Sequence, residues 1–313
     1  VDFNILSANY GQAGKNFAQG DFNYSGNVDS LDFNTLAANF NLDPEGRYTS
    51  FEVRQSAAAD FPTLRRHRIG IGLYDLADGA LRLRERIEVD VSGATTVIGE
   101  LVGRVQPDLL LLNDGDLTYA KLRLDERSLA TAVAHIDVVE DSLTRALLWS
   151  AAWDMTRDAE MRTTDWVELV LRGLGQETDQ SAVSRLTGFT RSFIANYSAP
   201  THRDGLRARW EEGLDGLLRA AEPGSDSQLV FARGYAAAAR SEAGLNRVQA
   251  ILDGTVTVEG LVIDADLRWT LLTALAAAGR AGEAEIEAEL ANDNTISGQE
   301  HAAGARTVRP TAE

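Results

Sequence analysis

The stretches Arg68-Ile-Gly-Ile-Gly-Leu-Tyr74 and Leu81-Arg-Leu-Arg-Glu-Arg-Ile-Glu-Val-Asp-Val91 alternate apolar and polar residues. A period of two residues is typical of β-strands that place one face in a core. The dipeptide Asp78-Gly79 lies between them and favours a tight hairpin turn. Further strands are predicted at residues 51–55, 95–100, 108–112 and 117–124. Residues 44–124 are therefore predicted to form a small antiparallel β-sandwich.

The run Asn113-Asp-Gly-Asp116 separates the last two predicted strands. Asp114 and Asp116 could belong to a metal cluster, but Asn, Asp and Gly are also the residues that tight turns require. We interpret the run as a hairpin turn rather than a metal site.

Downstream of the predicted sandwich, from Asp125 onward, the apolar residues recur at helical spacing. Three such stripes are Leu143/Leu147/Ala151/Met155, Val183/Leu186/Phe189/Phe193/Tyr197 and Leu206/Trp210/Leu214/Leu217. Residues 125–313 are predicted to form an all-α domain of helical hairpins stacked as a solenoid, because helices of ten to twenty residues alternate with short turns. The five tryptophans fall on these helical faces and are assigned to core packing: Trp149, Trp153, Trp166, Trp210 and Trp269.

Upstream of the sandwich, residues 21–32 read D-F-N-Y-S-G-N-V-D-S-L-D. Oxygen-bearing side chains stand at loop positions 1, 3, 5, 9 and 12 with Gly at position 6, the spacing at which an EF-hand loop surrounds Ca²⁺. The predicted calcium ligands are Asp21, Asn23, Ser25, Asn27 (through its carbonyl), Asp29 and Asp32. The alternative is an acidic, Asn- and Gly-rich turn that holds no metal.

The segment after this loop, Asp32-Phe-Asn-Thr-Leu-Ala-Ala-Asn-Phe40, nearly repeats Asp2-Phe-Asn-Ile-Leu-Ser-Ala-Asn-Tyr10. Residues 1–41 thereby resemble a dockerin-like module, in which two F-hand calcium loops are each followed by one helix. Because the sequence opens at Val1, the first loop is expected to be truncated and one calcium site to be complete. The resemblance implies an α-helical calcium module over residues 1–43, with a cohesin-like protein as its possible partner.

Composition limits the classes of function. The formal net charge is -17, which disfavours nucleic acid and anionic membranes as partners. The sequence has no cysteine, so disulfides and thiol catalysis are excluded. It contains no H-E-x-x-H, G-x-S-x-G or P-loop motif, and the four histidines stand far apart in the sequence. No catalytic residue and no zinc ligand is therefore assigned.

Several blocks of the larger part of the chain carry a second resemblance. They are Arg47–Gln55, Pro62–Ile69, Leu111–Leu124, Ala151–Asp158, Arg219–Asp226, Asp266–Trp269 and Gly279–Gly282. Through them, residues 44–313 resemble the C-terminal β-sandwich and helical cap of actinobacterial aminopeptidase N, a family of zinc metallopeptidases. In that family the cap closes over the active site and shapes a chamber that admits peptides but not folded proteins.

The resemblance departs from the family at its chemistry, because the zinc and substrate-amine motifs belong to a thermolysin-like domain that this sequence lacks. The chain is accordingly expected to be inactive alone: a non-catalytic sandwich and cap, with Zn²⁺ only in the missing domain, fused to a module that binds one Ca²⁺. Two alternatives are a secreted, calcium-dependent binding or scaffold protein and an accidental fusion of two gene fragments. The aminopeptidase-like part suggests the cytoplasm, whereas the dockerin-like part suggests secretion.

Overall fold

The computed structural model describes residues 8–15, 19, 27 and 41–310. The chain divides into two compact units. The first contains residues 1–75 and 83–120, and the second contains the hairpin tip at 76–82 together with residues 121–313. The order of a β-rich part followed by an all-α part agrees with the fold class predicted from the sequence.

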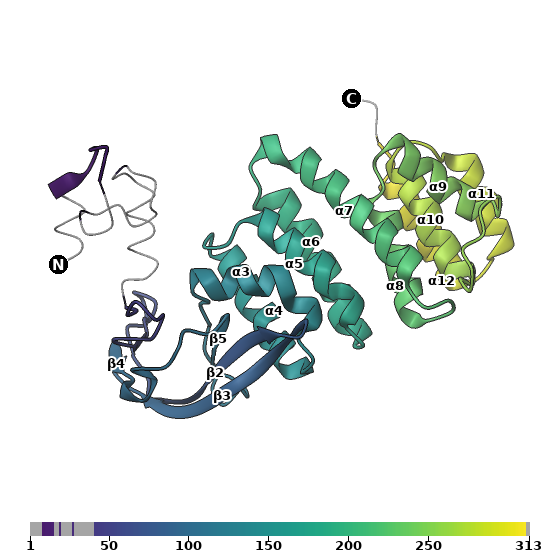
Figure 1. Cartoon of the computed structure of the whole chain (residues 1–313). Helices are drawn as coiled ribbons and strands as arrows, with labels where there is room; N and C mark the ends of the chain where they lie inside the picture. Colours follow the sequence, from purple (N-terminus) through teal and green to yellow (C-terminus); the bar gives the residue numbers. More distant parts are fainter. Residues whose placement is uncertain (1–7, 16–18, 20–26, 28–40, 311–313) are drawn as a thin grey trace. The chain divides into compact units, whose positions relative to one another are not determined.

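The first unit is built on two small antiparallel sheets (Figure 1). One sheet pairs β1 with β4, and the other has the order β3-β2-β5. The strands are β1 (Glu52–Arg54), β2 (His67–Ala77), β3 (Ala80–Val91), β4 (Thr95–Val97) and β5 (Leu109–Leu112). Asp78 and Gly79 both have positive φ, 52° and 77°, so the predicted hairpin turn between β2 and β3 is confirmed.

A single apolar core joins the strands of both sheets. Val53 of β1, Ile71 of β2, Val89 of β3 and Leu110 of β5 are all buried in it. Leu101, in the short 3₁₀ segment η2 (Gly99–Leu101), is fully buried in the same cluster. Alternation of apolar residues along the strands therefore places one face of each sheet in a shared core, as the sequence pattern predicts.

The prediction of a sixth strand at residues 117–124 is wrong. No strand is present there, and the segment runs as irregular backbone. The reason lies in Asn113, whose side chain donates to the Thr118 carbonyl (2.8 Å) and accepts from the Thr118 N–H (3.0 Å). These are the backbone groups that a neighbouring strand would otherwise bind, so the side chain replaces a sheet ladder.

The interpretation of residues 113–116 as a turn is correct, but the turn does not lead into a hairpin, and its first two residues, Asn113 and Asp114, are buried. Asp114 is 5% exposed and accepts a hydrogen bond from the Tyr74 hydroxyl (2.6 Å). Its carboxylate also lies 3.3 Å from the Arg86 Nε, and its backbone carbonyl accepts from Arg86 Nη2 (2.9 Å). Asp114 is thus a structural partner of Arg86 and Tyr74.

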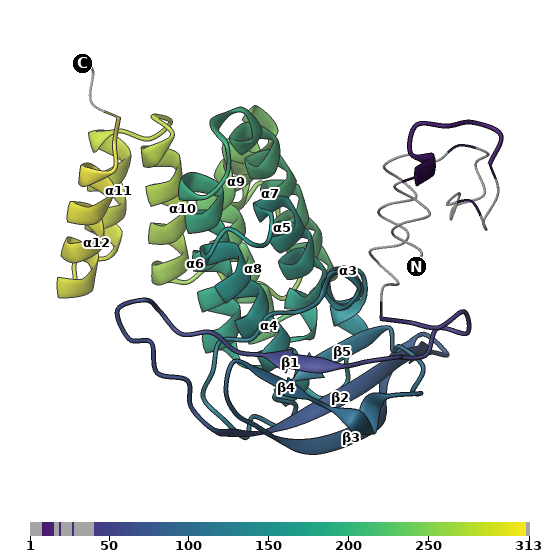
Figure 2. The ribbon, with the colours of Figure 1, turned by 90° about the vertical axis from the view of Figure 1, so that its left-hand side faces the viewer.

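The second unit consists of helices from α3 to α12, and Figure 2 shows them stacked in sequence. The helices pack in two rows: α3, α5 and α7 contact one another in turn, as do α6, α8, α10 and α12. Their bounds are α3 (Glu126–His135), α4 (Ser142–Arg157), α5 (Thr163–Gly173), α6 (Gln180–Asn196), α7 (Pro200–Ala220), α8 (Asp226–Ala238), α9 (Glu242–Leu252), α10 (Ala265–Ala277), α11 (Glu283–Asn292) and α12 (Ile296–Thr307).

Short polar side chains fix where most of these helices begin. Asp264 is the N-cap of α10, and its side chain accepts from the Leu267 N–H at 2.8 Å. Asp141 caps α4 in the same way through Thr144, and these hydrogen bonds lower the pKa of its carboxyl.

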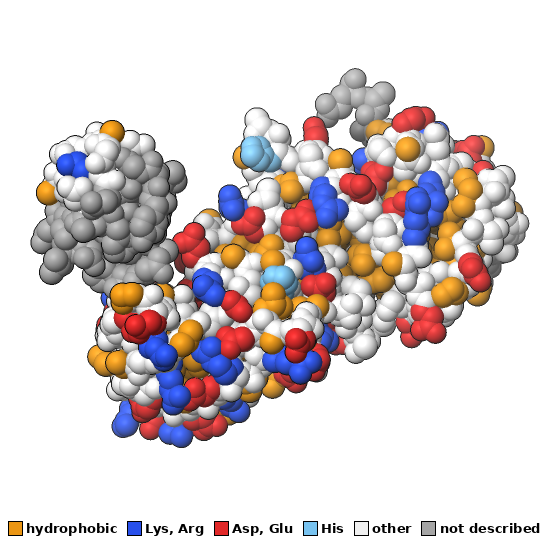
Figure 3. Space-filling view, viewed as in Figure 1, with side chains coloured by type: hydrophobic (Ala, Val, Ile, Leu, Met, Phe, Trp, Pro, Cys, Tyr) orange, Lys and Arg blue, Asp and Glu red, His pale blue; other side chains and the backbone are white. Residues whose placement is uncertain are grey.

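Acidic and basic side chains are interspersed over the face drawn in Figure 3, in keeping with the many ion pairs between neighbouring helices. None of the described helices is both long enough and apolar enough to span a bilayer.

Candidate functional site

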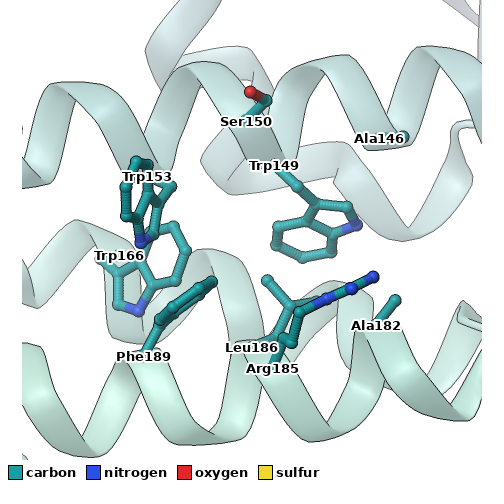
Figure 4. Close-up of a pocket in the computed structure, with 9 residues that line it drawn as sticks. All are labelled: Ala146, Trp149, Ser150, Trp153, Trp166, Ala182, Arg185, Leu186 and Phe189. Carbon is teal, nitrogen blue, oxygen red and sulfur yellow. The ribbon is translucent and has the colours of Figure 1, made fainter.

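A hollow lined largely by aromatic side chains opens between α4 and α6 (Figure 4). We call it the aromatic hollow. It has a volume of about 400 Å³ and is lined by Ala146, Trp149, Ser150, Trp153, Trp166, Ala182, Arg185, Leu186 and Phe189. Since α4 and α6 both pack on α5, the space between them has α5 as its floor.

Trp166 of α5 forms that floor and is fully buried. Its indole N–H donates to the Thr190 hydroxyl at 2.9 Å, and the same hydroxyl donates to the Leu186 carbonyl of α6. The ring also meets Phe193 edge-on, with centroids 5.1 Å apart. Because the polar edge of the indole has a partner, the ring can stay buried without a desolvation penalty.

Trp149 of α4 is fixed by a hydrogen bond to a buried ion pair. Its indole N–H donates to Glu177 Oε1 (2.8 Å), which also accepts from Arg145 Nε (2.9 Å). Arg145 is 7% exposed and in addition donates to the Val139 carbonyl at 2.7 Å. The three side chains satisfy one another, so the Trp149 ring has a defined orientation along the hollow.

Trp153 and Phe189 form the exposed rim. Their rings lie 5.4 Å apart and tilted, and the Arg157 guanidinium sits 5.2 Å above the Trp153 ring. Phe189 is 36% exposed, although it belongs to a predicted core stripe. The Trp153 indole N–H is buried and has no acceptor within the described part of the chain.

Arg185 supplies the cationic group beside these rings. In Figure 4 its guanidinium extends below Trp149, while Trp153, Trp166 and Phe189 gather on the other side and Ser150 points away. Arg185 is exposed and forms no ion pair with any residue that the structure describes. The arrangement can hold an apolar side chain between rings and place a carbonyl or carboxylate near Arg185.

The aromatic hollow contains no group suited to catalysis. Over residues 8–15, 19, 27 and 41–310, no three His, Cys, Asp or Glu side chains come close enough to hold a metal ion. Zinc therefore does not fit the residues described, and no step of hydrolysis can be assigned to them.

The predicted calcium site cannot be compared with the structure in the same way. Of its six residues, Asn27 alone is described; it is exposed and pairs with Ala13 in an isolated antiparallel bridge. The other predicted ligands, Asp21, Asn23, Ser25, Asp29 and Asp32, lie outside the described residues.

The assignment of the tryptophans to the core is confirmed for four of them: Trp149, Trp166, Trp210 and Trp269 are at most 7% exposed. Trp153 is partly exposed and lines the aromatic hollow. Sequence reasoning therefore missed the hollow. The available signal was the spacing of Trp149 and Trp153, four residues apart on one helix, which places two indoles side by side.

Comparisons with known proteins agree with this architecture. Residues 109–313 match the sequence profile of the ERAP1-like C-terminal domain, which covers β5 and all of the helices from α3 to α12. Over 292 residues the chain is 49% identical to "Aminopeptidase N" of Streptomyces lividans. The match covers 91% of this chain and 34% of that protein, so the chain spans about a third of its relative. The resemblance to aminopeptidase N is confirmed, and the chain belongs to the ERAP1-like C-terminal domain family.

Proposed function

We propose that this chain is the non-catalytic, C-terminal part of an aminopeptidase of the aminopeptidase N type. The proposal is supported by its relationship to that protein over a third of the relative's length and by the absence of an H-E-x-x-H motif from the sequence. Hydrolysis would then depend on zinc held by another part of the enzyme, which this sequence does not contain.

The observation that carries a more specific role is the aromatic hollow. Peptides present apolar side chains and backbone carbonyls at regular intervals, and the hollow offers rings beside the Arg185 guanidinium. We infer that the α4–α6 face forms part of the wall of a peptide chamber and holds an apolar side chain of the substrate. Binding at a distance from the cleaved bond raises affinity for longer peptides without contacting small substrates.

The third of Streptomyces lividans Aminopeptidase N that matches this chain can be replaced by it to test the role. In this chimera, Trp153→Ala is expected to raise the KM for a pentapeptide about fivefold, because an indole face is lost from the hollow. The kcat/KM for an amino-acid arylamide, which is too short to reach the hollow, should stay unchanged. Steady-state kinetics on both substrates measures the difference.

Leu143→Ala is the matched control, since Leu143 lies on the same helix, is 43% exposed and does not line the hollow. It should leave both substrates unaffected. Equal effects of Trp153→Ala on the pentapeptide and the arylamide would contradict the chamber-wall role. Sustained arylamide turnover by the isolated chain with added Zn²⁺ would contradict the non-catalytic assignment.

We further propose that residues 21–32 bind one Ca²⁺ and that this segment engages a cohesin-like partner. The support is the spacing of oxygen-bearing side chains in the sequence. Calorimetric titration of the chain should show one calcium site, and Asp21→Ala should abolish it because the first ligand of the loop is lost. Asp60→Ala, an exposed aspartate outside the loop, should titrate like the unmodified chain. Equal calcium binding by both variants would disprove the site.

A further inference from the structure

A second hollow, separate from the aromatic one, opens between α7 and α9. We call it the polar hollow. It has a volume of about 370 Å³, and charged side chains from α7 and α9 line it above Tyr235 of α8. Its floor is thus a helix of the row α6, α8, α10 and α12, whereas the floor of the aromatic hollow is α5, in the other row. The two hollows share no lining residue.

The Tyr235 hydroxyl is the first group that indicates a ligand site in the polar hollow. Its side chain is 3% exposed and lines the polar hollow, yet its hydroxyl forms no hydrogen bond with any of the described residues. A hydroxyl that borders a hollow and has no partner among the described residues is free to bind a molecule there. Burial, together with the charge of Asp215, raises the pKa of Tyr235 to about 12, so the hydroxyl remains a donor near neutral pH.

Two arginines, Arg219 and Arg247, line the same hollow and have N–H groups that can bind a ligand. Asp215 lies 2.9 Å from Arg247 Nε and 2.5 Å from Arg219 Nη2, so one carboxylate holds both guanidinium groups in place. Within the described residues, the Nη atoms of Arg247 have no acceptor. A guanidinium with free N–H groups binds a carboxylate through two parallel hydrogen bonds, and the Tyr235 hydroxyl can supply a third donor.

The two glutamates of the polar hollow differ in whether their carboxylates already have partners among the described residues. Glu211 is 7% exposed, and its carboxylate is occupied by the backbone N–H groups of Arg240 and Ser241. Glu212, on the next position of α7, is exposed and forms no ion pair among the residues described. It remains available for an ammonium group at the rim. A simple anion would meet these carboxylates, whereas a molecule carrying both charges would satisfy both sets of groups.

We propose that the polar hollow binds a free α-amino acid. Its carboxylate accepts from Arg247, Arg219 and the Tyr235 hydroxyl, and its ammonium group donates to Glu212. The volume lies at the small end of the range for ligand sites, which suits a molecule of this size. Ala208 and Ala243, both lining residues, leave room for the amino-acid side chain. Because the hollow is distinct from the aromatic hollow, this site does not depend on the chamber-wall role.

Binding can be measured on the 1–313 chain by ligand-observed NMR and calorimetry with L-alanine and L-leucine. N-acetyl-L-leucine and L-leucinamide serve as probes that lack the ammonium or the carboxylate. The free amino acids should bind in the millimolar range or tighter, and both blocked forms at least tenfold more weakly. Tyr235→Phe should weaken amino-acid binding about tenfold, because a hydrogen bond to a charged group is lost. Glu212→Gln should weaken it as well.

The same Tyr235→Phe variant separates a binding role from a structural one. The hydroxyl has no hydrogen-bond partner among the described residues, so its removal should leave the Tm unchanged or raise it. Tyr197→Phe is the matched control: this half-exposed tyrosine is the C-cap of α6, and the variant should bind the amino acids normally. The proposal is overturned if neither amino acid binds at about 10 mM, if the blocked forms bind equally well, if Tyr235→Phe binds normally, or if it lowers the Tm.

Discussion

Replacing Glu211 by alanine should lower the free energy of unfolding of the helical unit by about 3 kcal/mol, among the largest effects of any single substitution in this chain. The carboxylate accepts from the Arg240 N–H (2.7 Å) and the Ser241 N–H (3.0 Å), and the Ser241 hydroxyl also donates to it. The Ser241 hydroxyl in turn accepts from the Gly244 N–H at 2.9 Å. Alanine would leave these part-buried donors at the start of α9 without the Glu211 carboxylate as their acceptor.

The size of this effect follows from the position of Glu211 rather than from its charge alone. The side chain reaches from α7 to the N-terminus of α9, where four backbone N–H groups have no partner within the helix and the helix dipole favours a negative charge. Glu211→Gln keeps one oxygen acceptor, so it should cost less than Glu211→Ala. Glu212→Ala, on the exposed neighbouring position, should change the stability by less than about 0.5 kcal/mol.

Gly244 provides an independent test of the same contact. A Cβ at this position would lie 2.1 Å from Glu211 Oε1, so Gly244→Ala must displace the carboxylate. The double variant Glu211→Ala/Gly244→Ala should then be less destabilised than the sum of the two single variants. Denaturant unfolding followed by tryptophan fluorescence measures all four proteins, since every tryptophan lies in the second unit. Strict additivity would show that Gly244 is not required to make room for the carboxylate.

This cap illustrates what the sequence could and could not predict. Asp264 caps α10 from the position just before the helix, and an Asp that precedes an apolar-periodic run is a signal that a sequence shows locally. Ser241 has the same local signature, but the glutamate that binds it comes from another helix, 30 positions earlier in the chain. Nothing in a single sequence connects two such positions, so the pairing of Glu211 with Ser241 required the structure.

Helical periodicity predicted which faces of the helices lie in the core, and it was wrong at individual positions of these stripes. Leu206, Trp210 and Leu214 are buried as expected. Phe189 and Leu143 belong to stripes of the same quality but are 36% and 43% exposed. Periodicity indicates that a face is apolar, yet whether another element covers it depends on packing between distant segments. The aromatic hollow arises where α4 and α6 leave such a face partly uncovered.

The strand prediction failed for a different reason. Residues 117–124 alternate in hydrophobicity, but Asn113 occupies the backbone groups of Thr118 that a ladder needs. The family relationship could be read from blocks of sequence such as Ala151–Asp158 without any structure, since it rests on identity rather than on spacing. The sites inside the helical unit could not, because their residues come from three helices each.

The second large effect concerns Gly70, in the middle of β2. A Cβ added there would lie 2.2 Å from the backbone carbonyl oxygen of Asp114 and 2.7 Å from Arg86 Nε. Gly70 is buried, and its carbonyl accepts from the Asp114 N–H at 3.1 Å, so the two backbone segments are in direct contact. Gly70→Ala is therefore expected to destabilise the first unit by about 3 kcal/mol, because backbone rather than a flexible side chain must move.

The hydrogen bonds around Asp114 explain why a shift of the turn's backbone costs much free energy. If its backbone shifts, the hydrogen bond from Arg86 to its carbonyl and that from the Tyr74 hydroxyl to its carboxylate lengthen together. A buried acceptor that loses charged or hydroxyl donors adds to the steric cost. Asp114→Asn keeps an oxygen for the Tyr74 hydroxyl and removes the ion pair with Arg86, so it should destabilise the unit less than Gly70→Ala does.

Hydrogen exchange of the β2 and β5 amides measures the effect where tryptophan fluorescence cannot, since the first unit contains no tryptophan. Protection in these strands should fall in Gly70→Ala, while the helices of the second unit keep theirs. Gly99→Ala is the matched control: its φ is not positive and a Cβ there meets nothing within 4 Å, so protection should not change. Equal protection in Gly70→Ala and Gly99→Ala would mean that position 70 does not require glycine for the close approach of β2 to the turn at Asp114.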